Sequence, residues 1–288
     1  MTNSTEPTTG HSLPQELWSS VLSTTGEDPF TLYWFWLTLV GHIVIFGYGG
    51  LYVLIDLTER PRFLRRYKVQ EGTNTPMDMG KFKRLLPRVL FNQLIINTVA
   101  NIALYGCQFY MHGPSHQSIR ELPSIAEALT HLTVSILLAE IIFFYSHWAL
   151  HHRALYKYIH KIHHEWTAPI AWEALYSHPI EHIISNLLSI TAGPLLLGSH
   201  ISMTMFWAGL ASFGSVTSHS GYHLPFFRSP EAHDYHHLKF NQCYGVMGFL
   251  DTLHGTNRKF KKSVQGKRHR VFFSTKAAKE IVLEDKRD

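Results

Sequence analysis

The sequence predicts an all-α fold, an integral membrane helical bundle of about three spans plus a helical hairpin, with a cytosolic, histidine-rich helical cap. Two observations carry this prediction. Apolar runs without formal charge recur along the chain, and several approach the roughly 20 residues that cross a hydrocarbon core. Histidines gather outside those runs, and 14 of the 21 lie between residues 147 and 237.

The two ends of the chain are expected to lie outside the bundle. Residues 1–29 are rich in Ser, Thr, Pro and Glu, which predicts a disordered tail, and a glycosylation sequon at Asn3 carries little weight so near the terminus. The first apolar run begins near Phe30 without a basic flank, so no signal peptide is expected. Residues 261–288 form a basic tail without an anchor, and the two cysteines provide no disulfide framework.

Residues 30–123 are expected to hold membrane spans and a basic cytosolic loop. Residues 31–55 carry no formal charge and exceed the length of one crossing, although a buried helix of a soluble protein is the alternative. Nine Lys and Arg residues between 60 and 88 favour a cytosolic loop by the positive-inside rule. The second run, 89–111, carries amides at four-residue spacing that are expected to join helices: Gln93, Asn97 and Asn101.

A third apolar run, 124–146, leads directly into the first histidines. The polar connection before it contains His112 and His116, which are expected to be plain loop residues. Glu140 lies inside the run, where an ionisable group is a functional candidate by default. It precedes His147 by seven residues, so both face one side of a continuous helix. Glu140 is expected either to support the histidine site or to lie near the headgroups at a helix end.

Residues 183–218 contain no formal charge and are expected to form the hairpin. A Gly-Pro pair at 193–194 and a Gly-Ser pair at 198–199 break the run, which leaves each half too short for a comfortable crossing. A single crossing would also place His178 and His219 on opposite faces of the membrane. A hairpin that enters and returns keeps all the histidines on the cytosolic side.

The histidines themselves form three boxes and two pairs with recurrent spacing. The boxes are His147-x3-His151-His152, His160-x2-His163-His164 and His233-x2-His236-His237, and the pairs are His178-x3-His182 and His219-x3-His223. Residues three and four apart share a helical face, so the members of each box are expected to converge. Neutral imidazole is the commonest side-chain metal ligand near pH 7. About ten histidines exceed the needs of one ion, which favours two, although imidazole suits Zn, Cu, Fe and Ni alike.

The amino-acid sequence around the boxes resembles that of a known family. The segments HKIHHEWTAPIAWEALYSHPIEH, SHSGYHLPF and HDYHHLKFNQCYGVMGFLDTLHGT are similar to the membrane fatty acid hydroxylase and sterol desaturase superfamily. Within it they resemble the branch that holds C4-methylsterol oxidases and fatty acid hydroxylase domain-containing protein 2. The resemblance covers about residues 85 to 260, and it implies a fatty acid hydroxylase domain over 124–260.

The resemblance also implies a metal centre and its ligands. It implies a non-haem centre of two Fe ions that activates O2, although Zn is possible in purified protein because Zn binds such sites more tightly than Fe(II). The catalytic metal ligands expected from it are His147, His152, His160, His163, His164, His219, His223, His233, His236 and His237. His151 and His178 are added as further metal ligands, and His182 is expected behind the ligands. Carboxylates that orient ligands, or that are simply solvated, are Glu165, Glu181, Asp234 and Asp251.

This centre predicts an integral membrane lipid oxygenase. The chain lacks a flavin, nicotinamide or haem motif, so an external electron donor is required, and the resemblance implies cytochrome b5 or its reductase at the endoplasmic reticulum membrane. The predicted reaction is oxidation of sterol C4-methyl groups, with fatty acyl or sphingolipid hydroxylation as the alternative. A non-catalytic metal- or lipid-binding relative and a metal carrier are the other classes. The basic patches lack a nucleic-acid-binding motif, so anionic lipid is the expected partner.

Overall fold

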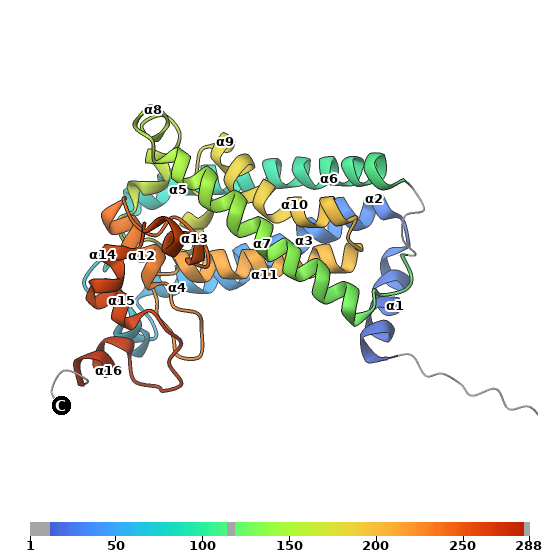
Figure 1. Cartoon of the computed structure of the whole chain (residues 1–288). Coiled ribbons are helices and arrows are strands. Elements are labelled where there is room, and N and C mark those ends of the chain that lie inside the picture. Colours follow the sequence, from blue (N-terminus) through green and yellow to red (C-terminus); the bar gives the residue numbers. More distant parts are fainter. Residues whose placement is uncertain (1–11, 114–118, 285–288) are drawn as a thin grey trace, which may run out of the picture.

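The computed structural model describes residues 12–113 and 119–284, and every regular element in them is helical (Figure 1). The one extended feature there is an isolated antiparallel bridge between Lys68 and Tyr222. Figure 1 shows the long helices running side by side, with α12 to α16 gathered at one end of the bundle and α1 and α2 at the other. The predicted all-α bundle is therefore confirmed.

Within the described residues, four helices are long and apolar enough to cross a membrane, which indicates a membrane protein. The first combines α2 (Pro29–Thr31), η1 (Leu32–Trp36), α3 (Leu37–His42), η2 (Ile43–Tyr48) and α4 (Gly49–Thr58). The second combines α5 (Met79–Leu90), η4 (Phe91–Ile96) and α6 (Asn97–His112), the third is α7 (Ile125–Leu150), and the fourth combines α9 (Pro179–Glu181), η7 (His182–Leu187) and α10 (Leu188–Leu197). A capping box between Ser124 and Glu127 fixes the start of α7.

The predicted hairpin is present. Gly198 ends α10 in the left-handed conformation, and α11 (Ile201–His219) returns beside it. The fourth helix spans 19 residues, longer than expected, because it begins before the uncharged run. Gly193 permits a close approach to α7, since a Cβ there would lie 2.5 Å from the Ser135 Cα. Both ends of the hairpin meet at His163, which lies 3.4 Å from the Tyr176 carbonyl and 3.4 Å from His219 Nε2.

The expected disordered tail is wrong for residues 12–29. Helix α1 (Leu13–Thr25) buries Trp18 and Leu22 in a cluster with side chains from the first and second membrane helices and α11. The Trp18 indole also donates to the Ile119 carbonyl at 2.8 Å. The overall composition of the segment is polar, but these two side chains four residues apart give it one apolar face. Asn3 and His116 lie outside the described residues.

Short helices form the cap at the histidine-bearing end of the bundle. They are η3 (Arg62–Tyr67), α8 (Arg153–Tyr156), η5 (His160–Glu165), η6 (Ala171–Leu175), α12 (Glu231–Lys239), α13 (Phe249–His254), α14 (Arg258–Lys262), α15 (Val264–Arg268) and α16 (Ala278–Glu284). The basic loop joins this cap, because the Tyr67 carbonyl accepts the His223 amide at 2.8 Å. The C-terminal segment also folds back, with the Tyr67 hydroxyl donating to the Thr275 carbonyl at 2.7 Å.

The amide stripe of the second helix does join helices. Asn101 donates to the Thr38 hydroxyl of the first helix at 2.9 Å, and Asn97 pairs with His182 of the fourth at 2.6 Å. His182 also lies 3.2 Å from the Asn186 amide, so both of its ring nitrogens are engaged inside the bundle. The stripe and His182 therefore hold the bundle together on the side where the fourth helix starts.

Candidate metal centre

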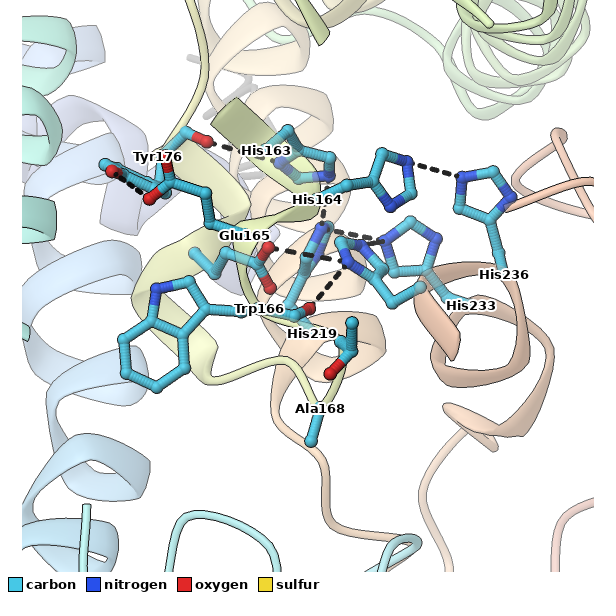
Figure 2. Close-up of polar contacts among 12 residues, drawn as sticks. His163, His164, Glu165, Trp166, Ala168, Tyr176, His219, His233 and His236 are labelled. Carbon is cyan, nitrogen blue, oxygen red and sulfur yellow. Dashed lines mark hydrogen bonds and ion pairs between the residues drawn. The ribbon is translucent and has the colours of Figure 1, made fainter. Parts of the chain in front are cut away.

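Nine imidazoles meet inside the cap in two groups, within each of which the nitrogens lie within 4.8 Å of one another. Group one consists of His147, His151, His160, His164 and His236, and group two consists of His163, His219, His233 and His237. Seven of these side chains are buried, and His151 and His233 are partly buried. Figure 2 shows His163, His219 and His233 turned toward one another, with His164 and His236 beside them.

In group one the Nε2 atoms face a common space. His160 Nε2 lies 2.9 Å from His151 and 3.0 Å from His164, and other neighbours in the group approach to between 3.1 and 3.2 Å. A neutral imidazole carries one proton, so these crowded nitrogens cannot all be satisfied by hydrogen bonds to one another. Metal–nitrogen bonds of about 2.0–2.1 Å place adjacent ligand nitrogens about 3 Å apart. The spacing therefore fits imidazoles arranged around an ion.

Group two has the same character with fewer donors. His233 Nε2 lies 2.8 Å from His219 and 3.1 Å from His237, and His163 Nε2 lies 3.4 Å from His219 (Figure 2). These inward nitrogens again outnumber the protons available to pair them. Four convergent imidazoles meet the usual number of zinc ligands, and the donor type also suits iron.

The second and third histidine boxes are each divided between the two groups. The expectation that the members of one box converge on one site is therefore wrong. In η5, His160 and His164 enter group one while His163 enters group two. In α12, His233 and His237 enter group two while His236 enters group one. The cause is that both segments lie between the groups, so side chains on adjacent faces of one turn reach different centres. From the first box, His147 and His151 enter group one at the end of α7.

The outward Nδ1 atoms fix how the rings are presented. His147 donates to the Tyr244 carbonyl at 2.7 Å, and His236 donates to the Gln242 carbonyl at 2.7 Å. In group two, His219 donates to the Ser215 carbonyl at 2.8 Å. An imidazole that donates from Nδ1 carries its free electron pair on Nε2, so these contacts select the tautomer whose inward nitrogen can bind a metal.

Two buried carboxylates also contact ligand rings from behind. Glu181 lies 2.8 Å from Nδ1 of His160 in group one. Glu173 lies 3.4 Å from Nδ1 of His237 in group two, whose main partner is the Trp166 carbonyl at 3.1 Å. Such a carboxylate orients a metal-bound imidazole and raises its basicity. Glu173 was not predicted, although it is the one formally charged residue between 166 and 180.

Burial keeps the rings of His151, His160 and His236 neutral. Desolvation lowers the pKa of His151 to about 2, and the neighbouring His147 adds to this effect. Burial, followed by nearby imidazoles, also holds the pKa of His160 and of His236 well below the usual value for histidine. At pH 7 these rings therefore carry free electron pairs rather than positive charges, which is the state that binds metal.

Three predicted ligands lie outside both groups. His152 is exposed and caps α8, with its Nδ1 3.4 Å from the Ala154 amide. His178 caps α9 in the same manner, with its Nδ1 3.2 Å from the Ile180 amide. His223 is buried, but its ring lies 3.3 Å from Glu231 and 3.0 Å from the Arg270 carbonyl. His151, in contrast, belongs to group one.

The other predicted carboxylates contact no histidine ring. Glu165 accepts from the Tyr176 hydroxyl at 2.8 Å, and Asp234 accepts from two glutamine side chains. Asp251 and Glu140 both bind backbone amides of the loop that follows α12. Sequence reasoning also missed the Tyr244 ring, which lies 5.1 Å from His151 and covers group one. Tyr244 lies between Cys243 and Gly245, outside every histidine box, so no spacing pattern indicated it.

The bundle of long apolar helices and its paired imidazole groups define a membrane protein whose histidine clusters could bind metal. A model of the fatty acid hydroxylase family matches residues 132–256. The chain is 44% identical over 255 residues to human fatty acid hydroxylase domain-containing protein 2, covering 88% of this chain and 76% of that relative. The chain belongs to the fatty acid hydroxylase family, a family of oxidoreductases, which confirms the resemblance.

Two further relatives carry names that specify chemistry. Fatty acid hydroxylase ahd1 of Mycosarcoma maydis is 39% identical over 239 residues, covering 81% of this chain and 60% of that relative. Methylsterol monooxygenase 2-2 of Arabidopsis thaliana is 28% identical over 233 residues, covering 77% of this chain and 84% of that relative. No solved structure matched the chain.

Proposed function

We propose that the protein is an O2-dependent lipid oxygenase that holds one Fe ion in each histidine group. The observation that carries this proposal is the pair of adjacent groups whose buried, neutral imidazoles turn their Nε2 atoms inward. Iron in such a site supplies the activation of O2 for oxidation of a C–H bond. Purified protein is expected to contain Zn where Zn is abundant, because Zn²⁺ binds these donors more tightly than Fe²⁺.

The chain's own residues then have separable roles. We assign the nine imidazoles of the two groups as metal ligands, within a catalytic domain that spans residues 124–260. Backbone carbonyls hold the Nδ1–H of several ligands, while Glu181 and Glu173 hold His160 and His237 from behind. These contacts hold the rings in place before metal arrives, which reduces the entropy lost on binding.

For the substrate, we propose the C4-methyl group of a sterol. The support is the methylsterol monooxygenase relative, which this chain matches over 84% of its length. Hydroxylation of a fatty acyl or sphingolipid chain is the second candidate, and the 39% identical relative named as a fatty acid hydroxylase favours it. Both substrates are lipids, so each would reach the cap from the bilayer around the apolar helices.

Lipid profiling of cells that lack the protein tests the substrate. We expect 4-methylsterols to accumulate, and the His163→Ala and His236→Ala variants to reproduce the accumulation at normal protein level. His112→Gln is the control, because His112 ends α6 away from both groups and glutamine keeps a donor for the Leu195 carbonyl. A fall in hydroxylated acyl chains with normal sterols would select the second candidate. If neither lipid class changed, a non-catalytic relative would be the better description.

For location, we propose the endoplasmic reticulum membrane with the cap in the cytosol, and cytochrome b5 or its reductase as electron donor. The support is that the basic loop packs against the cap, so both lie on the same side, and the positive-inside rule favours the cytosol for that loop. Single cysteines at Arg62 and Glu121, in a chain without the native cysteines, test this. A membrane-impermeant reagent applied to sealed microsomes should label position 62 and spare position 121; the reverse labelling would contradict the orientation. Reconstitution with each candidate donor tests the electron source.

A further inference from the structure

One loop, residues 242–248, supports imidazoles of group one and, among the contacts of residues 12–113 and 119–284, none of group two. Its Gln242 carbonyl accepts from His236, and its Tyr244 carbonyl accepts from His147, both at 2.7 Å. The described Nδ1 contacts of group two go to other parts of the chain: the carbonyls of Ser215, Trp166 and Tyr176 and the carboxyl group of Glu173. The position of this loop therefore decides how two of the five imidazoles of group one are presented.

Two buried carboxylates hold the loop through its backbone. Asp251 accepts from the amides of Tyr244 and Gly245, both at 2.8 Å. Glu140 accepts from the next three amides, those of Val246, Met247 and Gly248, at 2.8, 2.7 and 3.2 Å. Both acids are only 1% exposed. Charge-assisted hydrogen bonds to amides are stronger than neutral ones, and here they take the place of regular secondary structure.

The backbone conformation of the loop directs its amides toward Glu140 and Asp251. Cys243 and Gly248 both have positive φ, 61° and 79°, which turns the intervening amides toward one side. Gly245 lies between the two acids, and a Cβ there would be 2.7 Å from Glu140 Oε1 and 3.0 Å from Asp251 Oδ2. A side chain at this position would displace the carboxylates or the loop, so the close approach requires glycine.

We propose that Glu140 and Asp251 are positioning residues for group one, acting on His147 and His236 through the loop's carbonyls. Glu140 and His147 lie on the same helix, α7, so the helix and the loop contact each other at two points about two turns apart. Releasing one point lets the Tyr244 carbonyl move away from His147. Group two lacks this connection. The proposal rests on the proposed metal site and adds that its two halves can be weakened separately.

Metal titration of the full-length protein in detergent tests this, with Zn²⁺ alone as the probe and a chromophoric chelator as competitor. We expect Gly245→Ala to weaken one of two binding events roughly 10–100-fold, the effect of losing a group that supports a ligand, and to leave the other within about twofold. Glu140→Gln is the second variant, because it keeps the size of the side chain. Gly106→Ala is the matched control, since a Cβ there meets nothing within 4 Å.

Double variants identify the weakened centre. Gly245→Ala combined with His163→Ala should bind no tight Zn²⁺, because each change weakens a different group. Combined with His164→Ala, it should keep one tight site. Equal weakening of both sites, or two unchanged sites in both variants, would overturn the proposal. A wild-type protein that binds no Zn²⁺ would contradict the proposed function itself, which makes the two failures distinguishable.

Discussion

Group one and group two use the same kind of donor but are built differently. Group one takes five imidazoles, including two from the end of the membrane helix α7, and its supporting carbonyls come from a loop held by buried acids. Group two takes four, including His219 at the end of the hairpin, and its supporting carbonyls are those of Trp166, of Tyr176 just before the hairpin and of Ser215 within it. The comparison teaches that similar centres can be held by independent parts of a fold.

The largest expected effect comes from removing a ligand from either group. His164→Ala should remove one ion from group one, and His237→Ala should remove one from group two, because each change deletes one of the nitrogens that converge in its group. Each variant should fall from two ions per chain to one and lose at least about 100-fold in turnover. Metal analysis of iron-supplemented protein purified anaerobically checks this. A wild-type content near zero would contradict the assignment of both groups.

A smaller and more selective effect is expected from the carboxylates behind the ligands. Glu181→Gln should weaken group one and Glu173→Gln should weaken group two, each by about 10-fold or somewhat more in metal affinity. Glutamine keeps the size of the side chain but cannot carry the negative charge that would raise the basicity of a metal-bound imidazole. Competitive titration of Zn²⁺ resolves the two events. If either variant weakened both events equally, the groups would not be independent.

His223 was expected to be a metal ligand but lies outside both groups, so its substitution tests where group two ends. The His223→Ala variant should keep two ions but lose about 1–3 kcal/mol of folding free energy, since buried Glu231 and the Arg270 carbonyl lose their partner. Thermal unfolding in detergent with metal analysis of the same samples separates the two effects. Loss of one ion at unchanged stability would restore His223 to the ligand set.

The smallest effect is expected at His152 and His178, which cap α8 and α9. Replacing either with alanine should cost about 1 kcal/mol or less, as loss of an N-cap residue does, and should leave two ions bound. The same metal analysis applies. A clear fall in metal content in either variant would show that the caps rearrange to join a group when metal is present.

The sequence predicted the helices and the hairpin, because apolar runs and the breaks between them express both directly, and its histidine boxes and pairs contain all nine imidazoles of the two groups. It could not divide the boxes between two groups, since His163 and His164 differ only in which side of one turn faces which centre. The family resemblance implied His152 as a ligand, whereas its ring caps the start of α8 in the structure. The contacts made by the Gln242 and Tyr244 carbonyls could not be predicted either, because every residue has a backbone carbonyl and the sequence does not indicate which ones contact an imidazole.

The division of two boxes has a mechanical consequence. His163 and His164 are consecutive yet belong to different groups, with ring centroids 5.6 Å apart, and the consecutive pair His236 and His237 repeats the arrangement at 5.8 Å. Two pairs of consecutive residues therefore link the two groups through the covalent backbone. When a thicker or thinner bilayer tilts the long helices, the orientation of the cap can change, but the spacing between the two groups should hold.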